Sequence, residues 1–168
     1  METKMACVSM ETIMKTSKEP TPSHLEDHLG YWLRFVSNSV SRGFQQLLEA
    51  EGTSVTEWVA LRALFEQAGT SHAELIQRLG MTKGAASKVA SRLEEKGLVE
   101  RRPASRSRRE QVLCLTRKGR ALVPRLSALA DQNDAHFFGH MQVGQRKALR
   151  EMLEALVVHH QIHEVPVS

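Results

Sequence analysis

The sequence predicts a mainly α-helical protein that carries one small β-hairpin. Apolar residues recur at three- and four-residue spacing in six segments of the 168-residue chain, whereas short strand-like runs occupy 98–102 and 110–115. Hydrophobic residues make up 41% of the chain, which also holds 10 glycines and 5 prolines. This composition excludes collagen-like, low-complexity and wholly disordered proteins, so one folded core is expected.

The N-terminal part of the chain predicts an arm followed by two helices. Residues 1–22 lack a clear apolar period, which is typical of a flexible arm. Ser23 can cap a long first helix, whose apolar residues recur at helical spacing before Gly52 ends it. Thr56 can cap a second helix, which Gly69 closes.

The middle of the chain predicts a helix-turn-helix. Ser71 and Glu74 have the spacing of a capping box and begin a short third helix that ends at Gly80. Thr82 can cap a fourth helix, which Gly97 ends. Two helices joined by about four residues that include a glycine are the signature of this motif.

A β-hairpin and two more helices complete the expected order. The strand-like runs flank a polar loop, 103–109, that is rich in turn formers and arginine. Thr116 can cap a long fifth helix, and a sixth follows a break near 139–144. The long helices at the two ends carry more apolar surface than a small lobe can cover, which predicts a homodimer.

Positive charge is concentrated in one window of the chain. Residues 78–109 contain ten basic and three acidic residues, a net charge of +7, although the whole chain carries only +4. A basic stretch in otherwise acidic surroundings is typical of a surface that binds a polyanion. A solvated surface is the commoner explanation of a charge run taken by itself, so the motifs in this window have to decide.

The residues of the fourth helix fall on two different faces. At 100° per residue, its polar and small residues share one face, opposite an apolar face made by Ala86, Val89, Ala90 and Leu93. Any surface helix shows two such faces, but here the capping-box helix precedes it and the arginine hairpin follows it. We therefore expect a recognition helix in a major groove and a hairpin that reaches the minor groove or phosphates. The expected DNA-binding residues are Thr82, Lys83, Gly84, Ser87, Lys88, Ser91 and Arg92 in the helix, and Arg106, Arg108 and Arg109 in the hairpin.

Four stretches of the chain carry a family resemblance: LGYWLRFVSNSVSRGFQQLL, TEWVALRAL, AELIQRLGMTKGAASKVASRLEEKGLVERR and RREQVLCLTRKGRAL. The third is the most specific. From His28 to about Leu122 the chain resembles the MarR family of bacterial transcription regulators. The resemblance implies a dimeric winged helix-turn-helix in which the terminal helices dimerise, the fourth helix reads DNA and the hairpin is the wing. Family wings usually carry Asp-x-Arg; here Ser107 stands at the Asp position and Arg109 at the Arg position.

These observations predict three regions and one leading function. We expect a flexible arm at 1–22, a dimerisation region at 23–50 and 117–168, and a winged helix-turn-helix lobe at 51–116. The expected protein is a cytoplasmic, sequence-specific repressor that binds a pseudo-palindromic operator in double-stranded DNA as a homodimer. A small-molecule effector is expected to relieve repression, as is usual in the family. The alternative is an architectural, sequence-tolerant DNA-binding protein.

Other classes find less support in the sequence. The chain has no apolar run near the ~20 residues that span a bilayer, and no secretory signal. It lacks a phosphate loop, a nucleophile elbow and a zinc-protease motif, so we expect neither an enzyme nor a cofactor. A redox-responsive or metal-responsive regulator is a weaker alternative. It would use Cys7 or Cys114, or the histidines His136, His140, His159, His160 and His163.

No effector site is nominated from the sequence. Tyr31, Trp32, Phe35 and Trp58 are able to line a crevice between the dimerisation and DNA-binding regions. Their spacing matches the apolar stripes of the first two helices, however, which favours positions in the core.

Overall fold

The protein is described here by a computed structural model that covers residues 22–67, 69–104 and 107–162, with side chains at 107–110 outside the description. Most of the expected arm and the last six residues therefore lie outside the described part. The elements follow in the order η1 (Leu25–Asp27), α1 (Leu29–Ala50), α2 (Val55–Phe65), β1 (Thr70–Ser71), α3 (His72–Leu79), α4 (Lys83–Glu95), β2 (Val99–Ala104), β3 (Ser107–Leu115), α5 (Arg117–Phe138) and α6 (Val143–His159).

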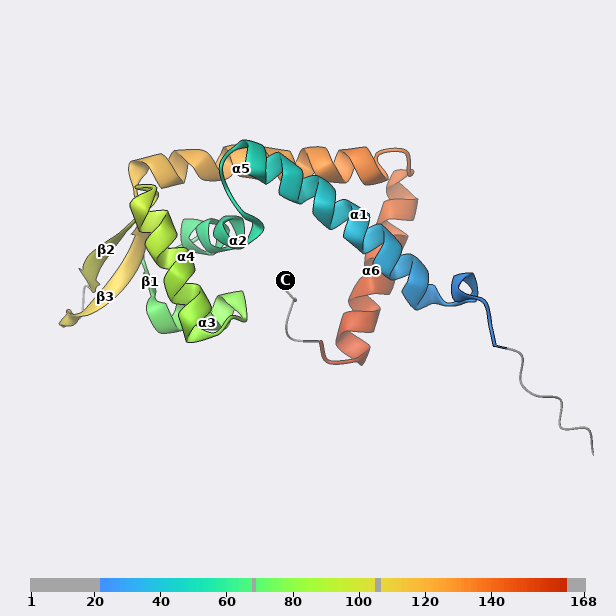
Figure 1. Cartoon of the computed structure of the whole chain (residues 1–168), viewed down its shortest axis with the longest axis horizontal. Helices are drawn as coiled ribbons and strands as arrows, with labels where there is room; N and C mark the ends of the chain where they lie inside the picture. The colour runs from blue at the N-terminus through green and yellow to red at the C-terminus, as the bar shows by residue number, and fades with distance from the viewer. Residues whose placement is uncertain (1–21, 68, 105–106, 163–168) are drawn as a thin grey trace, which may run out of the picture.

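A small lobe lies at one end of the molecule and long helices lead away from it (Figure 1). The lobe contains α2, α3, α4 and the sheet, and α5 runs from the sheet along α1 to α6. Asn133 of α5 donates a hydrogen bond to the Val40 carbonyl of α1 at 3.2 Å. Gly43 is needed at this crossing, because a Cβ there would lie 2.8 Å from the Asn133 side-chain oxygen.

Two helix starts differ from the sequence prediction. The N-cap of α2 is Ser54, not Thr56: its hydroxyl accepts from the Glu57 N–H at 3.2 Å, and the Glu57 carboxylate accepts from the Ser54 N–H at 2.9 Å. This reciprocal capping box satisfies two donors, whereas a cap at Thr56 satisfies only one. Ser23 does not cap α1 either, because the short η1 intervenes and His28 adopts an extended conformation before α1 begins.

The helix-turn-helix has the predicted boundaries. Ser71 and Glu74 form the expected capping box of α3, and Gly80 ends that helix in the left-handed conformation with φ 58°. Thr82 caps α4 by accepting from the Ala85 N–H at 3.3 Å. The turn between the two helices therefore needs only a left-handed glycine and one hydroxyl cap.

The sheet has three antiparallel strands in the order β1-β3-β2. The hairpin strands are longer than predicted and pair from Val99 with Leu115 to Ala104 with Ser107. A third strand, β1, has only two residues, pairs Thr70 with Leu113 and is not predicted from the sequence. It anchors the start of α3 to the inner strand of the wing and so fixes the helix-turn-helix against the hairpin.

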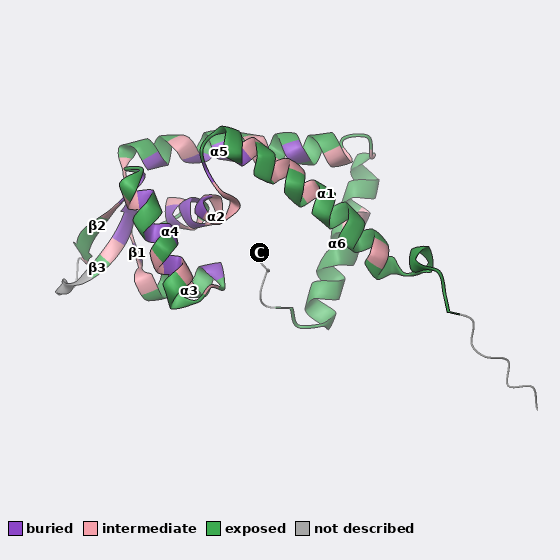
Figure 2. Cartoon of the chain, viewed as in Figure 1, coloured by how far each residue is buried: buried purple, intermediate pink, exposed green. Residues whose placement is uncertain are grey.

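Burial divides the chain into a packed lobe and exposed long helices (Figure 2). The lobe core joins leucines of α2, α3, α4 and the sheet with Leu48 of α1 and with Val123 and Leu126 of α5. The described part of α6 has no buried residue. Large apolar side chains remain exposed on the long helices; they include Trp32, Leu33, Phe35 and Val36 on α1 and Met152, Leu153, Leu156 and Val157 on α6.

Within the described residues, no helix is both long enough and apolar enough to cross a membrane.

Candidate nucleic-acid interface

The recognition-helix candidate α4 has one buried and one exposed face. Its buried residues are Ala86, Val89, Ala90 and Leu93, as the sequence predicts. The side chains of Lys83, Lys88, Ser91 and Arg92 are exposed, as are Thr82 and Gly84. No other heavy atom would lie within 4 Å of a Cβ on Gly84, so the backbone there is open to an approaching surface.

Ser87 differs from the other predicted contact residues because its side chain already has a partner. It is half-buried, and its Oγ lies 3.1 Å from Nε2 of His72, the first residue of α3. The hydroxyl therefore joins the two helices of the helix-turn-helix. No local pattern predicts this contact, since the two residues are 15 positions apart.

Several cations near α4 are paired within the protein. Arg101 of β2 donates to both oxygens of Glu94 at the end of α4, at 2.8 and 3.1 Å. These hydrogen bonds and the Glu94 charge raise the pKa of the Arg101 guanidinium above its usual value. Arg102 pairs with Glu100 on the same strand. Both acids belong to the basic window, so its net charge of +7 already takes these two pairs into account.

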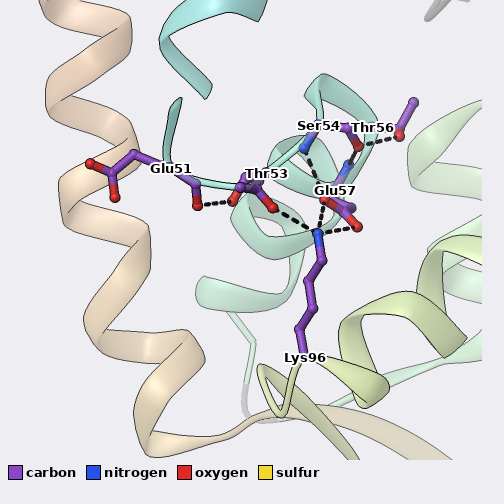
Figure 3. A network of polar contacts seen from close by, with 7 residues as sticks. Glu51, Thr53, Ser54, Thr56, Glu57 and Lys96 are labelled. Atoms are coloured by element: carbon purple, nitrogen blue, oxygen red, sulfur yellow. Dashed lines mark hydrogen bonds and ion pairs between the residues drawn. The ribbon is translucent and has the colours of Figure 1, made fainter. Parts of the chain in front are cut away.

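Lys96, directly after α4, makes three hydrogen bonds with its side-chain ammonium (Figure 3). Its ammonium donates to Oε1 and Oε2 of Glu57 at 2.8 and 2.7 Å, and to the Gly52 carbonyl at 2.8 Å. Glu57 is only 3% exposed. Burial acts to raise the pKa of this carboxylate, but hydrogen bonds from Lys96 and Ser54 and the Lys96 charge outweigh it, so the pKa is lowered.

Glu57→Gln is expected to destabilise the fold at neutral pH by about 1–3 kcal/mol, because hydrogen bonds to a charged group are lost. The lowered pKa of Glu57 means that its carboxylate stabilises the fold above the unfolded pKa, and this contribution is lost as pH falls through the folded pKa. Melting temperatures recorded between about pH 7 and pH 3 should therefore depend less on pH in the variant. Glu100→Gln, at an exposed pair, is the control; equal pH dependence in Glu57→Gln and the parent chain contradicts the assignment.

A pocket of about 360 Å³ opens beside this contact, between the end of α1 and the end of α4. It is lined by Glu49, Gly52, Thr53, Ser54, Glu57, Arg92 and Lys96. Arg92, predicted to face DNA, thus lies at the junction between the recognition-helix candidate and the α1–α2 turn.

The predicted wing arginines are only partly covered by the description. Arg106 lies outside the described residues, and the backbones of Arg108 and Arg109 belong to β3 while their side chains lie outside the description. The hairpin itself is placed directly after α4, at the edge of the lobe (Figure 1).

Comparison with known proteins places this geometry in a family. The family model described as "MarR family" matches residues 51–110, which run from the α1–α2 turn into β3. The HTH-type transcriptional repressor Rv2887 of Mycobacterium tuberculosis is 33% identical over 128 residues, 76% of this chain and 92% of the relative. The chain belongs to the MarR family.

Solved structures of the MarR family share the fold of about four fifths of the chain. BpsR of Bordetella bronchiseptica matches with a TM-score of 0.69 and 25% identity, over 81% of this chain and 97% of BpsR. Rv2887, solved in complex with DNA, matches with a TM-score of 0.66 and 32% identity, over 77% and 97% of the two chains. The predicted winged helix-turn-helix is confirmed, and the protein is a DNA-binding transcription regulator.

The remaining candidates from the sequence take different places in this MarR-family fold. Trp58 packs against the lobe core, but Trp32 is 49% and Phe35 60% exposed in the single chain, so the core position favoured for them is not reached within one protomer. Cys114 is buried in β3, and Cys7 lies outside the described residues. Among the described residues no three His, Cys, Asp or Glu side chains gather as a metal site.

Proposed function

We propose that this MarR-family protein is a sequence-specific repressor that binds a pseudo-palindromic operator as a homodimer and is released by a small-molecule effector. The exposed polar face of α4 carries the proposal. It presents Lys83, Lys88, Ser91 and Arg92 around an open glycine, opposite a fully packed face. Lysine and arginine meet guanine edges or phosphates in a major groove, and small residues let the helix approach.

The proposed DNA interface has two kinds of contact, base reading by α4 and backbone contacts by the wing. We assign base reading to the N-terminal half of α4, where Lys83, Gly84, Ser87 and Lys88 follow the cap Thr82, because recognition helices enter the groove by that end. Ser91 and Arg92 extend the contact along the groove walls. Arg106, Arg108 and Arg109 of the wing are proposed to hold the backbone or the adjacent minor groove.

The proposed dimer uses the long helices. The apolar side chains left exposed on α1 and α6 form a surface that a second copy would bury, and such large exposed apolar surfaces are unusual in monomers. We therefore assign 23–50 and 117–168 to dimerisation and 51–116 to DNA binding. Two lobes in a two-fold dimer present two α4 helices to successive major grooves, which favours an operator with two half-sites.

The proposed effector is a small aromatic acid. BpsR is regulated in its DNA binding by 6-hydroxynicotinic acid, and Rv2887 has been solved with p-aminosalicylic acid at 31% identity and a TM-score of 0.61. The dimer can adopt states in which its two α4 helices are too close together or too far apart to fit the operator. An effector that binds such a state shifts the population away from the DNA-binding state. The protein would act in the cytoplasm, without catalysis and without a cofactor.

An architectural role is the second candidate, and Ser107 is the observation that favours it. The wing lacks the carboxylate that orients the family arginine, so its contacts would be less specific. Selection of bound duplexes from a random-sequence pool tests both candidates. Convergence on an inverted repeat supports the repressor, and strong binding without convergence supports the architectural protein.

A further inference from the structure

The turn after α4 is hydrogen-bonded to the start of α5, to α2 and to the α1–α2 turn. The Lys96 N–H closes α4 on the Arg92 carbonyl at 3.0 Å. Its own carbonyl accepts from Lys118 of α5 at 2.9 Å, and the Gly97 carbonyl accepts from the Thr116 hydroxyl at 2.7 Å. The start of α5 is therefore hydrogen-bonded to the backbone of this turn.

The side chain of Lys96 reaches the turn that ends α1. This turn is fixed to α1 because the N–H groups of Glu51 and Thr53 both donate to Leu48, at 3.0 Å each. It is also fixed to α5, because Arg125 donates to the Glu51 carboxylate at 2.8 Å. The Gly52 carbonyl, which accepts from Lys96, therefore lies in a turn that is hydrogen-bonded to α1 and ion-paired with α5.

The three protons of the Lys96 ammonium match the three acceptors around it. One goes to Gly52 and two to the Glu57 oxygens, so the charge already has partners within the chain although the Lys96 side chain is 39% exposed. Glu57 is buried and has been desolvated, so it depends on this lysine as its counter-ion. Lys96 is thus unsuited to a phosphate contact, although it lies in the basic window beside α4.

We propose that Lys96 is a positioning residue, which fixes the C-terminal end of α4 to the α1–α2 turn and so sets the separation of the two recognition helices in the dimer. The inference rests on the proposed function, because separation matters only if two α4 helices bind one operator. Through Lys96, a change in the position of the dimerisation helices α1 and α5 moves α4 as a whole. Its contribution is geometric, so its loss would change which operator spacing is accepted.

The test is a series of operators in which the two half-sites found by selection are moved apart or together by one base pair. The parent chain should bind the selected spacing about tenfold or more tightly than either altered spacing. Lys96→Met, which keeps the stem and removes the ammonium, should bind the selected spacing about tenfold more weakly and lose most of this preference. Lys96→Arg should retain it, because the guanidinium also donates to a carboxylate and a carbonyl.

Controls separate this role from simple destabilisation. Lys147→Met removes the same charge from α6, where the partner is Glu151 at 3.7 Å, and should behave as the parent chain. If Lys96→Met does not fold, Glu57→Gln takes its place in the series, because it keeps the volume of the buried side chain. Melting curves of each variant show that the folded protein is being titrated.

The outcomes decide between the two claims. A spacing preference unchanged in Lys96→Met, or a loss that is equal at all spacings, overturns the positioning role and leaves the repressor intact. Failure of the parent chain to distinguish the selected site from shuffled DNA instead overturns the proposed function itself. A flattened spacing preference in Lys96→Met, with Lys96→Arg and Lys147→Met like the parent chain, supports the positioning role.

Discussion

Leu153→Asp is expected to convert the protein into a monomer and to weaken operator binding by about 100-fold or more. Leu153 is one of the apolar residues that α6 leaves exposed, and a carboxylate at this place would have to be desolvated when two copies meet. Two linked lobes bind two half-sites with an avidity gain of about 10² to 10⁴, and a monomer forfeits it. Sedimentation velocity gives the mass, and a fluorescence anisotropy titration gives the affinity.

The lobe should survive this change, because the described part of α6 contributes no buried residue to the single chain. Melting of the variant and its weak, salt-dependent affinity for any duplex provide that check. Lys147→Asp, beside Glu151 on the same helix, is the matched control and should remain dimeric. A Leu153→Asp protein that is still dimeric and binds normally would show that α6 does not form the interface.

Lys88→Ala is expected to weaken binding to the selected operator by about 1–3 kcal/mol, while binding to shuffled DNA changes little. Lys88 is exposed on the polar face of α4, whereas the next residue, Val89, is buried on the other face. The substitution therefore leaves the core unchanged. Titrations of both duplexes at the same salt concentration measure the difference.

A wing substitution provides the contrast to Lys88→Ala. Arg109→Ala should weaken operator and shuffled DNA alike and reduce the slope of log affinity against log salt by about one unit, as expected for a phosphate contact. Equal affinity of Lys88→Ala and the parent chain for the operator would mean that α4 is not the reading element. Ser87→Ala is a less direct probe, because it also removes the contact with His72.

Local patterns in the sequence predicted the helix-turn-helix well. A hydroxyl residue followed three positions later by a glutamate begins α3 at Ser71, and the same pattern begins α2 at Ser54. The prediction of Thr56 as the cap of α2 is wrong, because Ser54 and Glu57 form a capping box of the same kind as Ser71 and Glu74. The alternation of small, polar and apolar residues in α4 predicted its buried face correctly, because helix geometry alone decides which residues share a face.

Contacts between distant segments were beyond such patterns. The pair Lys96–Glu57 joins residues 39 positions apart. The capping-box spacing of Glu57 gives no sign of a distant partner, and Lys96 has no local signature that distinguishes it from a solvated charge. The strand β1 has two residues, too few to show an alternating period, and exists because β3 lies beside it. The apolar stripes of α1 and α6 are visible in the sequence, but in our proposal they are buried by a second copy of the chain, which local patterns do not reveal.

The most direct test of the central claim is an anisotropy titration of the purified protein with the DNA upstream of its own gene and with a shuffled duplex, at two salt concentrations. We expect the upstream DNA to be bound at least about 10³-fold more tightly than the shuffled duplex, with two protomers per site. Equal affinity for both duplexes with a steep salt dependence would contradict sequence-specific repression and favour the architectural role.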